Sequence, residues 1–252
     1  PSTRIADLPD AGHFKAVINL AGAGIFDRRW TEARKHILRD SRIRLTQDLA
    51  DWINASQTSP EVLISGSAIG IYGDQGDTEL DENSDSRADF SQQLCADWEH
   101  AALQAANRTR VCLIRTGLVL GRDGGLLQRM RLPFQFGLGG AIGDGRQWMS
   151  WIHLEDWLAI VERMIDEPGM RGAYNATAPN PVTNQAFSTR LAETLQRPML
   201  LPLPASFMKL LLGEMAALVL GSQRVVPQRL LAEGFHFQYP DLQGALRALL
   251  HS

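Results

Sequence analysis

The chain has 252 residues, of which 44% are hydrophobic and 21% are charged, and its formal net charge is −3. This composition is typical of a globular protein with a substantial core, and it excludes disordered and fibrous chains. The slightly acidic balance gives no general attraction to nucleic acid or to anionic membranes, so we expect neither as a partner.

Cysteine, histidine and hydropathy patterns bear on the cellular compartment, on metal binding and on membrane insertion. Cys95 and Cys112 are too few and too far apart for a disulfide framework or a zinc ribbon, which favours a reducing compartment, the cytoplasm. The six histidines lack metal-ligand spacing, so no metal site is expected. The most apolar stretch, residues 205–220, is interrupted by Lys209 and Glu214, which indicates a core helix and not a membrane span.

Strands and helices alternate along the first half of the chain. This alternation predicts parallel strands joined by helical crossovers, that is, a doubly wound α/β sheet of the Rossmann type. Residues 74–89 hold seven acidic side chains and are predicted to be a solvated surface loop. Strands are predicted at 16–20, 62–65 and 110–115, a long or broken helix at 31–54, and a helix that begins at the N-cap Asp89, with Gln92 three residues on, and runs to about residue 107.

The second half is less regular and richer in helix. A helix over 124–136 should end near Pro133, and the five glycines of 137–145 indicate a mobile loop beside a site. Further elements are expected as a strand at 148–153, a helix at 155–166, a short strand at 174–177, a helix at 183–196, and helical segments at 204–220, 222–232 and 242–250.

The segment Leu63–Gly73 reads Leu-Ile-Ser-Gly-Ser-Ala-Ile-Gly-Ile-Tyr-Gly. An apolar strand is predicted here, and it is followed by small residues, two serine hydroxyls and a tyrosine. In an open parallel sheet ligands bind outside the carboxyl ends of the strands, so Ser65, Ser67 and Tyr72 are candidate site residues. The alternative is a glycine-rich turn whose serines cap the next helix.

The start of the chain lacks a feature that the predicted fold calls for. The chain opens at Pro1 without methionine, and no G-x-G-x-x-G turn follows any strand. Gly22 and Gly24 are spaced like the start of such a turn, but Asp27 stands where the third glycine belongs. We therefore expect that residues precede Pro1 in the native protein.

Several short motifs together resemble one protein family. The chain is similar to the atypical extended short-chain dehydrogenase/reductases, and more narrowly to the YfcH-like epimerase family, also described as cell-division-inhibitor-like. The resemblance covers nearly the whole chain. Its motifs are Asn19-Leu-Ala-Gly22, Ser65–Gly73, Asp89-Phe90, Leu94-Cys95, Trp98-Glu99, Arg115-Thr-Gly117, Trp151-Ile-His153 with Asp156, and Arg229–Phe237 with Leu242 and Ala245-Leu246.

The resemblance implies a domain plan and a cofactor. Residues 1–178 would form the NAD(P)-binding domain and 179–252 a smaller region, of which 202–252 is the family's helical end domain. The cofactor would be NADP, with NAD possible. The upstream segment would carry the glycine fingerprint and the central strand, so 252 residues alone should not be a stable domain. The implied cofactor-binding residues are Asn19, Leu20, Ala21, Gly22, Ser65, Gly66, Arg115, Thr116, Gly117 and Leu118.

The catalytic pattern departs from that of the superfamily. Ser67 fits the serine that holds the substrate, but the Tyr-x-x-x-Lys pair falls on Phe90 and Leu94, or in another register on Ser91 and Cys95. Neither register supplies the pair, and phenylalanine cannot move a proton nor can leucine tune one. Tyr72 is the candidate substitute; the alternative is that its ring packs while its phenol lies at the surface.

Other residues near the glycine-rich loop are candidates for a substrate pocket. Arg146, Trp148 and Trp151 are expected to line it, although the tryptophans fit a core equally well. His153 is placed in the pocket as well, with a hydrogen-bonded structural role as the alternative. Cys95 is expected to be a buried hydrophobe.

Two functions follow from these residues. One is an NADP(H)-dependent oxidoreductase or epimerase with an altered proton relay, acting on an unknown small molecule. The other is a nucleotide-binding regulator that has lost turnover.

Overall fold

The computed structural model describes residues 5–122, 124–137, 139–199 and 202–250. The chain forms two compact units that are interleaved along the sequence. Unit 1 comprises residues 1–71, 88–115 and 159–174, and unit 2 comprises residues 72–87, 116–158 and 175–252. Each unit is described by itself.

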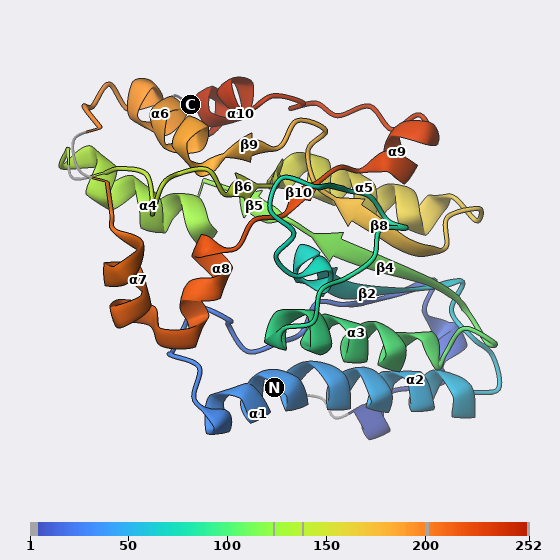
Figure 1. The fold of residues 1–252 in the computed structure, drawn as a ribbon. Coiled ribbons are helices and arrows are strands. Elements are labelled where there is room, and N and C mark those ends of the chain that lie inside the picture. The colour runs from blue at the N-terminus through green and yellow to red at the C-terminus, as the bar shows by residue number, and fades with distance from the viewer. Residues whose placement is uncertain (1–4, 123, 138, 200–201, 251–252) are drawn as a thin grey trace. The chain divides into compact units, whose positions relative to one another are not determined.

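The main sheet is parallel, which confirms the predicted α/β class. Residue pairing places Asn19 at the end of β1 opposite Ser65 of β2. The carboxyl ends of neighbouring strands therefore share one edge. The strand order is β1 (Ala16–Asn19), β2 (Val62–Ala68), β4 (Arg110–Thr116) and β8 (Gly172–Ala176) (Figure 1).

The helices of residues 32–55 and 90–103 in unit 1 lie below this sheet in Figure 1. α1 (Glu32–Arg39) continues through a π-helical turn, Asp40–Arg44, into α2 (Leu45–Ala55), so the predicted helix over 31–54 is one rod with a distortion in it. α2 packs on α3 (Phe90–Leu103), and α3 packs on β2. The Asp89 side chain accepts a hydrogen bond from the Gln92 N–H, as its predicted N-cap role requires. The buried core includes Ala50, Ile53, Leu63, Ala102, Val111 and Leu113, and single 3-10 turns lie at Ile5–Asp7, Ala11–His13 and Ile69–Tyr72.

Unit 2 contains three two-stranded sheets. β5 (Leu118–Leu120) pairs in parallel with β7 (Trp151–His153), and β3 (Glu79–Leu80) pairs in parallel with β10 (Arg224–Val225). β6 (Trp148–Met149) pairs antiparallel with β9 (Val182–Thr183). The predicted strand over 148–153 is thus two strands that meet at Ser150, which lies where the chain changes its pairing partner.

Most of the remaining chain is helical. α5 (Leu154–Asp166) begins in unit 2 and belongs to unit 1 from Ala159 onward. α6 and α10 pack together around a core that includes Trp151, Phe187 and Leu246 (Figure 1). The other helices of unit 2 are α4 (Gly125–Gln135), α6 (Asn184–Thr194), α7 (Ala205–Leu212), α8 (Ala217–Leu220), α9 (Gln228–Ala232) and α10 (Leu242–Leu250), with a 3-10 turn at Gly213–Ala216.

Two local expectations differ from the structure. The helical segment predicted at 222–232 is helical only from Gln228, because Arg224–Val225 form the strand β10. The helix α4 ends at Gln135, near Pro133 as expected. The acidic segment 74–89 is not entirely a solvated loop. It contains β3, and Glu82 accepts hydrogen bonds from the backbone of Asn175 (3.0 Å) and of Arg229 (3.2 Å), while burial raises the pKa of its carboxyl.

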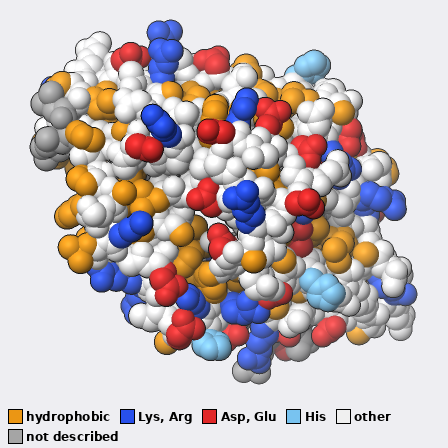
Figure 2. Space-filling model, viewed as in Figure 1, with side chains coloured by type: hydrophobic (Ala, Val, Ile, Leu, Met, Phe, Trp, Pro, Cys, Tyr) orange, Lys and Arg blue, Asp and Glu red, His pale blue; other side chains and the backbone are white. Residues whose placement is uncertain are grey.

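On the face shown in Figure 2, basic and acidic side chains are interspersed. No helix within the described residues has the length and apolar character needed to cross a membrane.

Candidate functional site

The turn after β1 is fixed by the Asn19 side chain, which is 3% exposed. Its Oδ1 accepts a hydrogen bond from the Ala21 N–H (3.2 Å), and its Nδ2 donates to Thr46 Oγ1 (2.7 Å). Leu20 beside it is 52% exposed. An asparagine anchored in this way holds the Leu20–Gly22 backbone in one shape at the open edge of the sheet.

Thr46, on α2, is the hub of a buried cluster below this turn. Its hydroxyl accepts hydrogen bonds from Asn19 and from Trp98 Nε1 (2.9 Å), and donates to the Arg42 carbonyl (2.6 Å). A hydroxyl has one hydrogen and two lone pairs, so Thr46 is saturated. The cluster ties β1, α2 and α3 together.

The end of β2 supplies the serines that the sequence singles out. Ser65 is fully buried, and its Oγ donates only a long bond of 3.4 Å to the Gly66 carbonyl. Any side chain at Gly66 would meet the Trp98 ring at 2.8 Å, which explains the glycine. Ser67 is 4% exposed, and its Oγ donates to Glu99 Oε1 at 2.6 Å.

Glu99 joins Ser67 to Arg115 at the end of β4. Arg115 Nε lies 2.8 Å from Glu99 Oε1, and Nη2 lies 3.0 Å from Oε2, a two-pronged ion pair with both side chains nearly buried. Paired guanidinium and carboxylate forks of this kind are rigid. The hydroxyl hydrogen of Ser67 is therefore held by Glu99, which leaves its oxygen lone pairs to accept a hydrogen bond from a ligand.

The role of Glu99 was not predicted from the sequence, although Glu99 lies in the Trp98-Glu99 motif. A signal was present, because Glu99 follows Cys95 by four residues and precedes Ala102 by three, on the inward stripe of α3. A charged residue on a buried helical stripe needs a partner.

The side chains at the start of α3, on which the two possible registers of the Tyr-x-x-x-Lys pair fall, are packed into the structure. The ring of Phe90 packs edge-on against Trp30 with centroids 4.9 Å apart. Leu94 is 2% exposed, and Cys95 is 5% exposed. Burial raises the pKa of the Cys95 thiol to about 12, with the Glu99 charge adding to the effect, so Cys95 is a protonated hydrophobe as expected.

Tyr72, in unit 2, has a buried phenol. The residue is 1% exposed, and its hydroxyl donates to Asn175 Oδ1 at 2.7 Å. Asn175 in turn donates from Nδ2 to the Val226 carbonyl at 3.0 Å. The alternative that the phenol lies at the surface is wrong, and the catalytic role of Tyr72 stays a prediction.

The Thr116–Leu118 segment also lies in unit 2. Thr116 Oγ1 accepts a hydrogen bond from Trp157 Nε1 at 3.1 Å. A Cβ on Gly117 would lie 2.5 Å from the Ser150 carbonyl oxygen, and Leu118 N–H donates to that same oxygen at 2.8 Å. The close approach of two backbones therefore requires the glycine.

The four pocket candidates have different surroundings. Trp148 donates from Nε1 to Asp77 Oδ1 at 2.9 Å. Trp151 is fully buried in the core of unit 2, and its Nε1 donates to the Asn180 carbonyl at 3.2 Å. This is the core alternative that the sequence left open. Arg146 is exposed, and only its backbone N–H is bonded, to Asp144 Oδ1 at 3.0 Å.

His153 lines a cavity of about 760 Å³ within unit 2. Its Nδ1 accepts a hydrogen bond from the Glu155 N–H (3.1 Å), and its ring stacks on Tyr239 with centroids 3.8 Å apart. Burial lowers the pKa of the imidazole, and Nε2 is buried without a partner among the described residues. Arg122, Glu155, three glycines and apolar side chains complete the lining.

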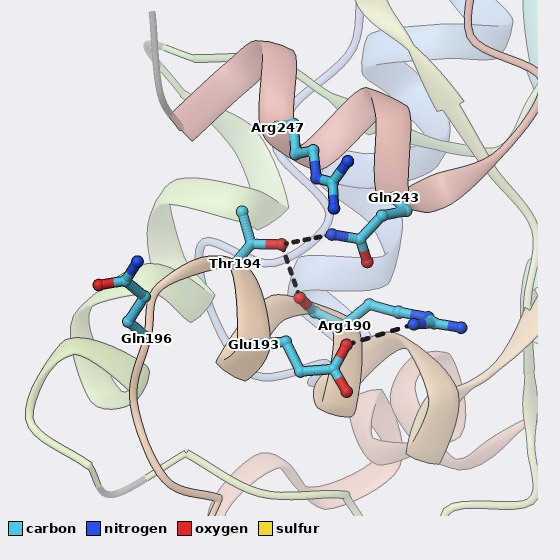
Figure 3. A pocket seen from close by; sticks show the side chains of 6 residues that line it. All are labelled: Arg190, Glu193, Thr194, Gln196, Gln243 and Arg247. Carbon is cyan, nitrogen blue, oxygen red and sulfur yellow. Dashed lines mark hydrogen bonds and ion pairs between the residues drawn. The ribbon is translucent and has the colours of Figure 1, made fainter.

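A second cavity of about 370 Å³ lies between α6 and α10 and contains none of the predicted site residues (Figure 3). In Figure 3 its polar groups largely bond to one another: Gln243 donates to Thr194 Oγ1, and Arg190 pairs with Glu193. This cavity is a polar groove of the helical region.

The predicted site residues are thus divided between the units. Within unit 1, the ends of β1, β2 and β4 bring together the Asn19–Gly22 turn, Ser65–Ser67 and Arg115 at one edge of the sheet. Tyr72, Thr116, Gly117, Leu118, Arg146, Trp151 and His153 belong to unit 2.

Comparison with known proteins gives a consistent set of relatives. The chain is 43% identical to the chloroplastic Epimerase family protein SDR39U1 homolog of Arabidopsis thaliana, with 93% of this chain and 68% of that protein covered. It is 39% identical to Epimerase family protein YfhF of Bacillus subtilis, with 94% and 78% covered. The crystal structure of human epimerase family protein SDR39U1 with NADPH superposes with a TM-score of 0.92 at 34% identity, with 97% of this chain and 83% of that chain covered.

Two family models match the chain. Residues 203–249 match a domain of unknown function, DUF1731. Residues 2–176 match the NAD dependent epimerase/dehydratase family. Together with the relatives at about 40% identity along nearly the whole chain, the second match shows that the chain belongs to the NAD dependent epimerase/dehydratase family.

Proposed function

We propose that the chain is an NADP(H)-binding oxidoreductase or epimerase with a non-standard proton relay, acting on a small molecule. The observation that carries the proposal is the convergence of the Asn19 turn, Ser67 and Arg115 on the carboxyl edge of one parallel sheet. The human relative crystallised with NADPH supports NADP as the cofactor, with NAD as the second choice.

The proposal gives each segment a role. The Asn19–Gly22 turn and Ser65–Gly66 would hold the adenosine half of the cofactor, and Arg115–Leu118 the nicotinamide end, where a hydride is given or taken. Arg146 and His153 stay assigned to the substrate side, whereas Trp151 is part of the core of unit 2. Residues 1–178 would be the nucleotide-binding domain, and 179–252 the smaller region.

Ser67 would orient the reacting group. Because its hydrogen is held by Glu99, its oxygen is an acceptor, which suits a substrate that presents a hydroxyl. Tyr72 is the proposed proton donor, although in this structure its hydroxyl donates a hydrogen bond to Asn175 Oδ1. Unchanged turnover in Tyr72→Phe removes Tyr72 from the mechanism and leaves the cofactor proposal standing.

The test is a pair of measurements on the purified protein. Titration with NADPH and with NADH, followed by tryptophan fluorescence, should show tighter binding of NADPH. A panel of carbonyl compounds with NADPH, and of alcohols with NADP⁺, should then reveal turnover that is lost in Ser67→Ala. Absence of binding to either nucleotide would contradict the proposal.

A second candidate is a nucleotide-binding regulator without turnover. It is favoured by the missing Tyr-x-x-x-Lys pair: one register puts Phe90, which packs on Trp30, at the tyrosine position, and the other puts Ser91 there. Tight NADPH binding without turnover of any panel compound would favour this candidate. The absorbance of the bound NADPH should then stay constant when each panel compound is added.

We also propose a reducing compartment, the cytoplasm, as the setting. Cys95 and Cys112 are both buried, and no disulfide joins them. The Arabidopsis relative, in contrast, is a chloroplastic protein. Fractionation of cells that produce the tagged protein tests the location.

A further inference from the structure

Two arginines border the turn that follows β1. The guanidinium of Arg42 lies against the backbone of Gly22, since a Cβ placed there would be 2.7 Å from Arg42 Cζ. Arg34 reaches the same turn from α1, and its Nη2 donates to the Gly24 carbonyl at 2.5 Å. Two positive side chains therefore flank Gly22–Gly24.

These two charges are largely removed from water. The Arg34 side chain is 12% exposed, and Arg42 is half-buried with Cζ 5.4 Å from the centroid of the Trp98 ring. Burial lowers the pKa of the Arg42 guanidinium, and the charge of Arg34 lowers it further, so the two cations are close enough to repel. Both stay charged at neutral pH because arginine does not lose its proton in proteins.

One carboxylate does lie at this turn, that of Asp27, which packs against Gly24: a Cβ placed on Gly24 would be 2.2 Å from Asp27 Oδ2. Among the described residues, Arg42 donates only to the Leu38 carbonyl (3.3 Å) and has no carboxylate partner. Arg34 has Asp27 at 3.8 Å, with that carboxylate 56% exposed, and its Nε is buried without a partner. The neighbouring cation Arg39 is by contrast paired directly with Asp97.

Two adjacent buried cations with incomplete pairing destabilise the free protein, and an anion between them would offset that cost. We propose that Arg34 and Arg42 bind a phosphate group over the Gly22–Gly24 turn. Guanidinium forks match phosphate oxygens in geometry, and Trp98 holds the Arg42 fork in place. The inference rests on the proposed function, because it places this phosphate on the dinucleotide or on a phosphorylated substrate bound beside it.

The test compares Arg42→Gln, Arg34→Gln and the matched control Arg44→Gln. Arg44 lies in the same π-helical turn as Arg42, is exposed, and loses the same charge. If the phosphate belongs to the dinucleotide, each site variant should bind NADPH about tenfold more weakly, while the control binds like the wild type. The loss should shrink at high salt, where the wild-type affinity itself falls.

If the phosphate belongs to the substrate, NADPH affinity stays unchanged in all variants. Inorganic phosphate should then raise the melting temperature of the NADPH-saturated wild type and of Arg44→Gln, but not of the two site variants. Unchanged NADPH affinity together with an unchanged response to phosphate overturns the inference. Failure of the wild type to bind NADPH overturns the proposed function instead, and phosphate stabilisation without NADPH still reports on the arginines.

A second variant guards against misfolding at Arg42, whose side chain also packs on Trp98. Arg42→Lys keeps the charge and the aliphatic stem but loses the fork. It should fold as the wild type does by circular dichroism and bind NADPH, or phosphate, more weakly than the wild type. Wild-type affinity of a folded Arg42→Lys variant would show that the guanidinium makes no bidentate contact.

Discussion

The ion pair of Glu99 and Arg115 couples stability to the proposed chemistry at the scale of single residues. Replacing Glu99 by Gln leaves the nearly buried Arg115 without its counter-charge. We expect the free energy of unfolding, measured in urea, to fall by about 3 kcal/mol, because a buried charge without its partner is costly. The double variant Glu99→Gln, Arg115→Met should recover part of this loss. An additive double variant would mean that the two side chains are not coupled.

Cys95 provides a test of burial through its pKa. Its folded-state pKa is raised from 9.0 to about 12, so the protonated thiol contributes stability that is fully present below pH 9. That stability is lost as the pH rises toward 12. The difference in unfolding free energy between the wild type and Cys95→Ala should therefore be constant below pH 9. Above pH 9 the unfolding free energy of the wild type should fall relative to that of Cys95→Ala.

The same burial predicts the chemical behaviour of the thiol. Iodoacetamide at pH 8 should label Cys95 only after unfolding, because the reactive thiolate is suppressed and the side chain is covered. Rapid labelling of the native protein, located by mass spectrometry, would contradict the buried position.

At the scale of secondary-structure elements, the Thr46 hydroxyl joins β1, α2 and α3, so its removal should destabilise the protein. Thr46→Val keeps the shape but leaves the donors of Asn19 and Trp98 without an acceptor. Each unsatisfied buried donor costs about 1–3 kcal/mol, so we expect a loss of about 2–4 kcal/mol in urea unfolding.

The matched control is Thr46→Ser, which keeps the hydroxyl and removes one methyl group at a cost of about 1 kcal/mol. NADPH affinity should drop in the valine variant, because the Asn19 turn loses its anchor. Equal stabilities of the two variants would show that the hub contributes packing and not hydrogen bonding.

The elements were predictable from sequence where local patterns dominate. The apolar run at 110–115, the cap at Asp89 and the helical spacing over 31–54 each specify their structure within a few residues. The break of 148–153 at Ser150 was not predictable, because it arises from a change of pairing partner far along the chain. Tertiary pairing also explains β3 within the acidic segment.

The candidate site was only partly predictable for a related reason. Strand-end residues such as Asn19, Ser67 and Arg115 follow from topology, since parallel strands end at one edge. Glu99, Thr46 and Arg42 lie mid-helix, and their roles depend on which strand end each helix face meets. Periodicity identifies such a face but not its partner.

The interleaving of the two units determines how the whole molecule should unfold. The chain passes between them at residues 71/72, 87/88, 115/116, 158/159 and 174/175. Both β8 and α5 run from one unit into the other, so we expect the units to unfold in one cooperative transition.

Tryptophans report on each unit separately, with Trp30, Trp52 and Trp98 in unit 1 and Trp148, Trp151 and Trp157 in unit 2. Two variants are compared, each of which keeps one set of tryptophans and has phenylalanine at the other three positions. In each variant, the urea midpoint from tryptophan fluorescence should equal the urea midpoint from circular dichroism of the same variant. Two separate midpoints would show that the units melt independently.

The same connectivity sets an order on biosynthesis. Unit 1 draws its last segment from residues 159–174, so a nascent chain must be extended past this point before the sheet can receive β8. Until then the ribosome holds a polypeptide in which the edge of β4 that receives β8 is unpaired. The interval between translation of β4 and of β8 is therefore when this protein has most need of a chaperone.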